Sequence, residues 1–304
     1  MNYETMNLFD DEKALRKYVE ECDLLLDKKI ESAIERIEKT SDFRIFGLTG
    51  PTCSGKTTAA KKITEYLEAQ GFCVHVISID DFYFDKEYLQ KRVEGDPNIE
   101  IDYDSEDTID IDLLAQQTEC LLSCKRTYLP HFDFRSGKRT EGEYIIPGKE
   151  DVFLFEGIQI LYPVVSAILN RHASYQSIYI CPTSAIRAGE SVFEPNEIRL
   201  MRRLVRDYRH RATLPEFTLY LWKSVRGNEE KNIFPYVKNC SATIDSTMPY
   251  EIGMLSSYLK PLLRSIPGTS EFYSDAQRIL LRIEPLGEIS ADYMTQKSLY
   301  KEFI

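Results

Sequence analysis

The amino-acid sequence predicts an α/β domain built on a five-stranded parallel sheet with helices on both faces. Five short runs rich in apolar residues recur along the chain, and stretches with helical spacing precede or follow them. The first of these runs leads directly into a glycine-rich turn and then a helical pattern. With 304 residues, of which 43% are hydrophobic, the chain can bury a sizeable core.

Composition and charge exclude several classes of function. The formal net charge of −11 works against non-specific binding of nucleic acid, which needs a net basic face. No apolar run approaches the length that spans a bilayer, and the N-terminus lacks the pattern of a secretory leader. Seven cysteines without a C-x-x-C pair are interpreted as reduced thiols. We therefore expect a cytoplasmic protein with no nucleic-acid or membrane partner.

The N-terminal segment predicts one amphipathic helix. Between Asp10 and Lys39 the apolar residues recur three and four positions apart, at Leu15, Val19, Cys22, Leu26, Ile30, Ala33 and Ile37. We expect residues 1–42 to carry this helix and residues 43–304 to form the α/β domain. The apolar face packs either on that domain or against a second subunit in a homo-oligomer, and the sequence leaves both open.

Two long excursions interrupt the alternation of strands and helices. The five expected strands cover residues 43–49, 73–79, 151–155, 177–181 and 242–245. One excursion, residues 85–149, contains a helical pattern at 111–122, and the other, residues 182–234, is rich in arginine. Long connections in a compact domain usually carry function.

Residues 50–57 match the pattern G-x-x-x-x-G-K-[ST] between an expected strand and an expected helix. Backbone N–H groups of such a loop surround phosphate oxygens, a lysine reaches the β- and γ-phosphates, and a hydroxyl ligates Mg²⁺. Cys53 is interpreted as a tolerated small residue rather than a redox switch. The pattern predicts ATP binding by Gly50, Pro51, Thr52, Cys53, Ser54, Gly55, Lys56, Thr57 and Thr58.

Acidic residues follow two of the expected strands. Asp80 and Asp81 come directly after the second strand and Glu156 ends the third. Ligands bind at the carboxyl edge of such sheets, where a carboxylate can accept a proton from an attacking hydroxyl or hold Mg²⁺. We expect Asp80, rather than Asp81, to be the base, and Glu156 to hold Mg²⁺ together with Thr57. The alternative is that these acids are solvated loop residues.

Arginines crowd an expected helix at residues 197–210. Arg199, Arg202 or Arg203, and Arg206 fall on one face at helical spacing. Arginine at that position suits phosphate clamping and charge stabilisation during phosphoryl transfer, and Lys56 and Arg203 are the expected catalytic cations. A solvated basic face is the alternative.

Several motifs, taken in order, resemble the uridine kinase family of P-loop nucleoside kinases. They are Asp-Asp-Phe-Tyr at 80–83, Leu-Pro-His-Phe-Asp-Phe at 129–134, Phe-Glu-Gly-Ile at 155–158 and Arg-Leu-Met-Arg-Arg-Leu-Val-Arg-Asp at 199–207. The stretches at 222–225 and 229–236 are similar to the kinase module that some bacteria carry behind a TGS domain.

The resemblance implies a P-loop NTPase fold with sheet order 2-3-1-4-5, an inserted substrate-binding excursion and an arginine-rich lid at about 182–234. It makes Asp80 the acid that activates the acceptor hydroxyl and Asp104 the ribose-binding aspartate. The remaining implied contacts are Tyr83, Phe132, Phe134 and Arg203 to the nucleoside, and Arg206 and Arg211 to the triphosphate.

The chain departs from the family at three places. Pyrimidine-specific members have a histidine where this chain has Gly137, an Arg-Gly-Arg lid where it has Arg211, Ala212 and Thr213, and an Ala-Asp pair where it has Cys240 and Ser241. Selectivity should therefore rest on the ribose more than on the base.

Three functions are consistent with these observations. The first is an ATP- and Mg²⁺-dependent kinase that phosphorylates the 5′-hydroxyl of uridine or cytidine in pyrimidine salvage. The second keeps the fold but takes another acceptor, such as a sugar phosphate or pantothenate. The third is a nucleotide-sensing partner protein with little turnover, which would not need a base such as Asp80.

Overall fold

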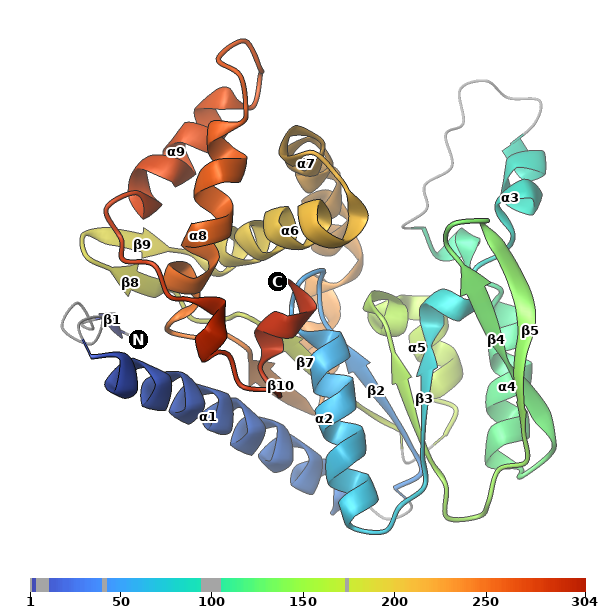
Figure 1. Ribbon diagram of the computed structural model, residues 1–304. Helices are drawn as coiled ribbons and strands as arrows, with labels where there is room; N and C mark the ends of the chain where they lie inside the picture. Colours follow the sequence, from blue (N-terminus) through green and yellow to red (C-terminus); the bar gives the residue numbers. More distant parts are fainter. Residues whose placement is uncertain (1, 4–10, 40–42, 94–104, 173–174) are drawn as a thin grey trace.

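The computed structural model describes residues 2–3, 11–39, 43–93, 105–172 and 175–304. Its central sheet has five parallel strands in the spatial order β10-β7-β2-β6-β3 (Figure 1). Numbered along the chain, this is the implied order 2-3-1-4-5. The strands are β2 (Ile45–Thr49), β3 (Val74–Ser78), β6 (Val152–Glu156), β7 (Gln176–Cys181) and β10 (Ala242–Asp245).

The two faces of the sheet support separate hydrophobic cores. Side chains alternate along each strand, so that Phe46 and Leu48 of β2 enter one core and Ile45 enters the other. The larger core lies under α1 (Glu12–Glu38), α2 (Lys56–Ala69), α6 (Pro195–Arg211), α8 (Glu251–Arg264) and α9 (Tyr273–Ile283). The smaller one lies under α4 (Ile111–Leu122) and α5 (Pro163–Leu169).

The N-terminal helix packs within the chain. Asp11 caps α1 by accepting hydrogen bonds from the backbone N–H groups of Lys13 and Ala14. The apolar stripe expected from the sequence is buried in the larger core, where α1 contacts α2 and β10. Asp23, a buried carboxyl on the same face, accepts hydrogen bonds from Tyr250 at 2.7 Å and Thr295 at 2.6 Å. Of the two packing modes left open, the structure shows the one within a single chain.

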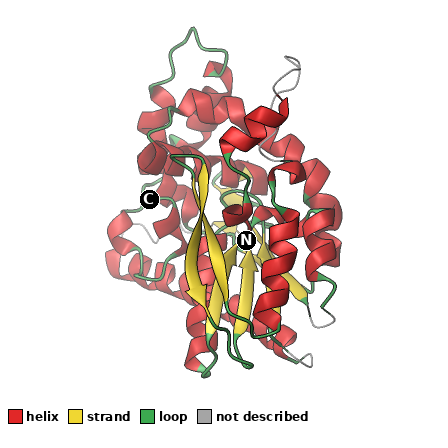
Figure 2. Cartoon of the chain, turned by 90° about the vertical axis from the view of Figure 1, so that its right-hand side faces the viewer, coloured by secondary structure: helices red, strands yellow, loops and turns green. Residues whose placement is uncertain are grey.

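The first excursion folds into a helix pair and a hairpin. The expected helix at 111–122 is present as α4, and α3 (Lys86–Val93) precedes it. The antiparallel hairpin of β4 (Thr127–Asp133) and β5 (Lys138–Ile145), which the periodicity did not predict, stands beside the sheet (Figure 2). Its first strand contacts the turn that follows β3, so the hairpin forms one wall of the sheet's carboxyl edge.

The second excursion lies over the phosphate-binding loop. It contains α6, which is longer than the expected helix at 197–210, and α7 (Pro215–Asn232). Two short strands, β8 (Ile186–Ala188) and β9 (Ser191–Phe193), precede α6, and β1 (Asn2–Tyr3) pairs with β8. The chain then returns after α9 to the start of α2, where Leu299 contacts the loop (Figure 1). Within the described ranges, no helix is both long and apolar enough to cross a membrane.

Truncating Leu26 should destabilise the protein far more than truncating its neighbour Leu24. The Leu26 side chain is 2% exposed, whereas Leu24 is 57% exposed. Leu26→Ala removes buried methyl groups and leaves a cavity, so we expect the free energy of unfolding to fall by about 2–5 kcal/mol. Leu24→Ala should change it by about 0.5 kcal/mol or less. Urea denaturation measures both, and equal losses would contradict the packing of α1 described here.

Candidate active site

A cavity of about 730 Å³ opens at the carboxyl edge of the sheet, between the phosphate-binding loop and the arginine-rich excursion. Its walls come from the loop before α2, the turns after β3 and β6, the helices α6 and α7, and the C-terminal segment. Eleven of the residues expected to act at the site line it together: Thr52, Cys53, Lys56, Thr57, Asp80, Tyr83, Phe134, Glu156, Arg203, Arg206 and Arg211.

Backbone geometry explains the two glycines of the loop. Gly55 has φ +95°, and a Cβ there would lie 2.2 Å from Leu299 Cδ1. A Cβ at Gly50 would lie 2.1 Å from the carbonyl oxygen of Ile180. Any side chain at either position would therefore displace the loop. Cys53, interpreted from the sequence as a tolerated small residue, is buried and adopts φ +57°.

The carbonyl groups of residues 50–55 in the loop all accept hydrogen bonds. Lys56 Nζ donates to the carbonyl oxygens of Gly50 at 2.9 Å and Pro51 at 3.2 Å. The further donors are Arg199 to Thr52 O, Arg202 to Cys53 O, Ser246 Oγ to Ser54 O and Ala59 N to Gly55 O. In a trans peptide the N–H group points away from the carbonyl of the same unit. The N–H groups of Cys53, Ser54 and Gly55 therefore point away from Arg199, Arg202 and Ser246.

Arg199 and Arg202 are structural residues. Each is fully buried, and each forms a two-pronged ion pair with a buried glutamate. Arg199 reaches Glu229 at 2.6 and 2.7 Å, and Arg202 reaches Glu251 at 2.7 and 3.0 Å. Burial acts to lower the pKa of Arg202, but its contacts, foremost with Glu251, outweigh it and raise that pKa. The expectation of one arginine face toward phosphate is wrong for these two residues, and the alternative of a solvated basic face is wrong as well.

Three further arginines of α6, Arg203, Arg206 and Arg211, line the cavity and share one partner. Asp207, which is buried, accepts hydrogen bonds from Arg203 Nε at 3.1 Å and Arg206 Nη2 at 2.7 Å. Arg211, more than half exposed, lies 3.8 Å from the same carboxylate. Arg206 also donates to the Thr52 hydroxyl at 3.4 Å. One carboxylate among three guanidinium groups leaves an excess of positive charge, which suits an anionic ligand.

The two aspartates after β3 have different partners. Asp80 Oδ1 accepts a hydrogen bond from Gln159 Nε2 at 2.6 Å, and Gln159 Nε2 also contacts the Tyr83 hydroxyl at 2.8 Å. Asp81 instead accepts from the backbone N–H of Phe132 at 2.9 Å. Asp80 is thus oriented at the cavity wall, whereas Asp81 ties the β4–β5 hairpin to the sheet.

Glu156 ends β6 on the same edge and faces the loop. Its carboxylate accepts a hydrogen bond from Ser78 Oγ at 2.7 Å. Burial, and then the charges of Asp80 and Asp81, raise its pKa above the ordinary glutamate range. Thr57, which carries a hydroxyl group, lines the same cavity. These oxygen donors, gathered where negative charge is in excess, fit the ligand preferences of Mg²⁺.

An aromatic cluster forms the wall next to Asp80. The Tyr83 ring meets Phe132 at 5.6 Å and Phe134 at 6.2 Å between centroids. Phe132 and Phe134 meet edge to face at 5.1 Å, so a flat ring cannot be inserted between them. Phe132 is buried, while Phe134 is 58% exposed and offers a free face. Asp104, expected to bind ribose, lies outside the described residues.

Comparison with known proteins decides the family. The model of the phosphoribulokinase/uridine kinase family matches residues 45–251, which include the loop, both acidic turns and α6. The chain belongs to this family. It is therefore a phosphotransferase that acts on a hydroxyl group, in agreement with the resemblance found in the sequence.

Curated members of the family are about 30% identical to this kinase over the aligned residues. A uridine kinase of Clostridium perfringens is 30% identical over 180 residues, covering 59% of this chain and 75% of that protein. Uridine-cytidine kinase C of Dictyostelium discoideum is 30% identical over 144 residues, covering 47% and 29%. The solved structure of the YGR205w protein has a TM-score of 0.52 and 18% identity, covering 74% of this chain and 92% of that one, a likeness in fold.

Two residues of the kinase site were missed by sequence reasoning. Gln159 orients Asp80, and its position just after the Glu156–Gly157 strand end was an available signal. Glu302 lines the cavity and accepts hydrogen bonds from the Thr58 backbone N–H at 3.4 Å and hydroxyl at 3.3 Å. No local pattern marks Glu302, because its place depends on the return of the C-terminal segment to α2.

Removing one charge of the Arg202–Glu251 pair should lower the free energy of unfolding more than removing both charges. Arg202→Met leaves Glu251 as an unpaired buried charge, so we expect the free energy of unfolding to fall by about 3–5 kcal/mol. The double variant Arg202→Met/Glu251→Leu should cost clearly less than the sum of the two single variants. Chemical denaturation of all four proteins measures this coupling.

The exposed pair Lys91–Glu87 provides a matched control. Its side chains are 63% and 69% exposed, so Lys91→Ala should cost about 1 kcal/mol or less. If the double variant loses as much unfolding free energy as the two single variants at Arg202 and Glu251 together, the view that each charge needs the other is contradicted.

Proposed function

We propose that this kinase transfers the γ-phosphate of ATP to the 5′-hydroxyl of a ribonucleoside, with uridine and cytidine as the foremost acceptors. The observation that carries the proposal is the convergence of Lys56, Asp80 and Arg203 on one cavity. A phosphate-binding cation and an oriented carboxylate face the same space, which is what transfer from a nucleotide to a hydroxyl requires.

The donor side of the cavity would hold the triphosphate. N–H groups of the loop and of the first turn of α2 supply donors and positive potential, and Lys56 would turn from the loop carbonyls to the β- and γ-phosphates. Arg206 and Arg211 approach from the excursion above, which we propose acts as a lid. Thr57 and Glu156 would hold Mg²⁺, which neutralises charge on the β- and γ-phosphates when bound.

On the acceptor side, Asp80 would take the proton of the attacking hydroxyl. The hydrogen bond from Gln159 fixes one carboxylate oxygen, and the other can face the acceptor. The hydroxyl oxygen of the acceptor forms a bond to the γ-phosphorus. At the same time the bond between the γ-phosphorus and the oxygen that bridges it to the β-phosphorus breaks, and ADP leaves. Arg203 balances the negative charge that gathers on the transferred group.

The nucleoside would stack on Phe134 beside Tyr83. Gly137 has no side chain that could contact the edge of the base. The position also disfavours one, because its φ is +68° and a Cβ there would lie 2.4 Å from Lys86 Cδ. Asp104 and Arg203 remain the proposed ligands of the ribose. This division supports selection by the sugar more than by the base.

The same features also support a second acceptor class. A P-loop kinase for another small alcohol would use the same loop, base and lid. Gly137 provides no side chain that could contact the edge of a base, and this favours keeping the second candidate. A nucleotide sensor without turnover is less well supported, because it would not need a carboxylate such as Asp80 at the cavity wall, held there by Gln159.

Asp80→Asn should abolish most turnover while leaving nucleotide affinity unchanged. Loss of a positioned base costs about 10²–10⁴ in kcat. Asp81→Asn is the matched control, since Asp81 bonds the hairpin backbone, and it should lose less. Coupled ADP-release kinetics and titration with ADP separate the two effects. A larger loss of kcat in Asp81→Asn would reverse the assignment.

Ribonucleosides should be phosphorylated well ahead of 2′-deoxyribonucleosides, with only a modest preference for uridine and cytidine over adenosine. The measurement is kcat/KM for these nucleosides, deoxyuridine and several non-nucleoside alcohols. Asp104→Ala should erase the ribose preference without changing the KM for ATP. Turnover confined to a sugar phosphate or pantothenate would favour the second acceptor class.

A further inference from the structure

Three metal-ligating side chains meet at the amino end of the sheet, opposite the carboxyl edge that carries the active site. Cys73 immediately precedes β3, His75 is the second residue of that strand, and Asp151 immediately precedes β6. Residues two apart on a strand project from the same face. The pairing of β3 with β6 brings Asp151 alongside, and Val152 N donates to Cys73 O at 2.8 Å. The backbone itself therefore gathers the three side chains.

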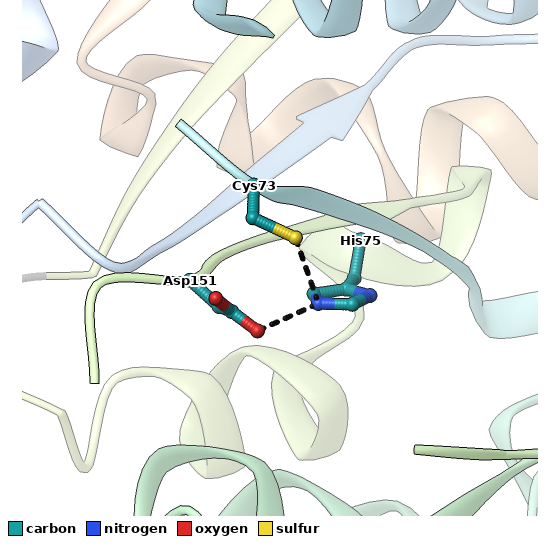
Figure 3. Close-up of side chains that lie close together, drawn as sticks. All are labelled: Cys73, His75 and Asp151. Carbon is teal, nitrogen blue, oxygen red and sulfur yellow. Dashed lines mark hydrogen bonds and ion pairs between the residues drawn. The ribbon is translucent and has the colours of Figure 1, made fainter. Parts of the chain in front are cut away.

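The donor atoms converge on one point (Figure 3). His75 Nε2 lies 3.7 Å from Cys73 Sγ and 2.9 Å from Asp151 Oδ2, and all three atoms lie within 4.8 Å of one another. Both contacts are made to the same ring nitrogen. A cysteine nucleophile would need the carboxylate on the opposite nitrogen, where it orients the imidazole. Convergence on a single nitrogen matches a shared metal instead.

The donor separations are near those of a tetrahedral zinc ion and need small side-chain adjustments to match them. Bond lengths of about 2.3 Å to sulfur and 2.0–2.2 Å to nitrogen and oxygen place tetrahedral donors about 3.4–3.6 Å apart. The Cys73–His75 separation agrees, and the His75–Asp151 separation needs to open by about half an ångström. A set of sulfur, nitrogen and oxygen donors favours zinc over magnesium or calcium. A thiolate and a carboxylate also balance its two positive charges.

Neighbouring groups hold the ligands in place. Asp151 Oδ2 accepts a hydrogen bond from Gly148 N at 2.8 Å, and the His75 ring stacks on Phe153 at 5.5 Å. The nearby Arg44 guanidinium donates to the backbone carbonyls of Asp151 and Gly148. Arg44 therefore stabilises the turn between Gly148 and Asp151 through hydrogen bonds to backbone carbonyl groups. Cys73 is exposed, so the fourth position of the ion is open to water.

We propose that Cys73, His75 and Asp151 form a zinc site that ties the edge strand β3 to β6. The site takes no part in the transfer of phosphate, and it stands independently of the acceptor proposed above. Binding releases the thiol proton, because the thiolate is the ligand.

Cobalt substitution tests the site in the full chain. The protein, without a histidine tag, is stripped with a chelator and titrated with Co²⁺ in the absence of nucleotide. One equivalent should give tetrahedral cobalt spectra with thiolate charge-transfer absorption, and Zn²⁺ should displace it. Cys73→Ser should abolish that absorption. We expect His75→Ala and Asp151→Asn to weaken metal binding at least about tenfold. Mutation of groups that only hydrogen-bond to metal ligands already lowers metal affinity by about that factor.

Cys124→Ser is the matched control. Cys124 is also partly exposed and lies at the same end of the sheet, but its thiol contacts Gly148 O at 3.5 Å. This variant should keep the full absorption. A second readout is thermal: Zn²⁺ should raise the Tm of the wild type saturably, and Asp151→Asn should need at least about tenfold more Zn²⁺ for the same rise. No charge-transfer band in the wild type, a band that survives Cys73→Ser, or an equal loss in Cys124→Ser would overturn the proposal.

Discussion

Hydrogen bonds from Arg199 and Arg202 to the back of the phosphate-binding loop are the contacts on which the rest of the active site depends. A loop that presents N–H groups to phosphate must place its carbonyl groups elsewhere, and buried carbonyls without partners are costly. The guanidinium groups satisfy the carbonyls of Thr52 and Cys53, and buried glutamates compensate the cations. Because both arginines come from α6, the same helix that fixes the loop also carries Arg203 toward the cavity.

The parallel sheet supplies the second requirement, which is to bring acids and cations to one edge. Asp80 and Glu156 follow neighbouring strands, so the pairing of β3 with β6 sets their spacing. Burial, and then the charges of Asp80 and Asp81, raise the pKa of Glu156, so holding these acids together disfavours the charged form. The positive charge of Lys56 partly offsets this cost. The opposite edge of the same two strands gathers Cys73, His75 and Asp151 by the same geometry.

Local patterns in the sequence predicted the elements well, and long-range contacts account for what they missed. The helix at 111–122 was predicted from its periodicity, and the strand order was implied by the resemblance to the uridine kinase family. The structural role of Arg202 was missed because its partner Glu251 is 49 residues away. Glu302 and the metal-ligating trio depend on where distant segments meet. The sequence analysis favoured Asp80 over Asp81 as the base, and the different hydrogen-bond partners of the two carboxylates supply a physical reason to separate them.

Transfer of isotopic label from ATP to the acceptor tests the central claim most directly. The kinase is incubated with uridine, Mg²⁺ and ATP carrying ¹⁸O in its γ-phosphate, and the phosphorylated products are identified by mass spectrometry and ³¹P NMR. The structure predicts uridine 5′-monophosphate that carries the labelled phosphoryl group, formed by the wild type and not by Asp80→Asn. Label found only in inorganic phosphate, or on no nucleoside of a full panel, would contradict the assignment of this cavity to nucleoside phosphorylation.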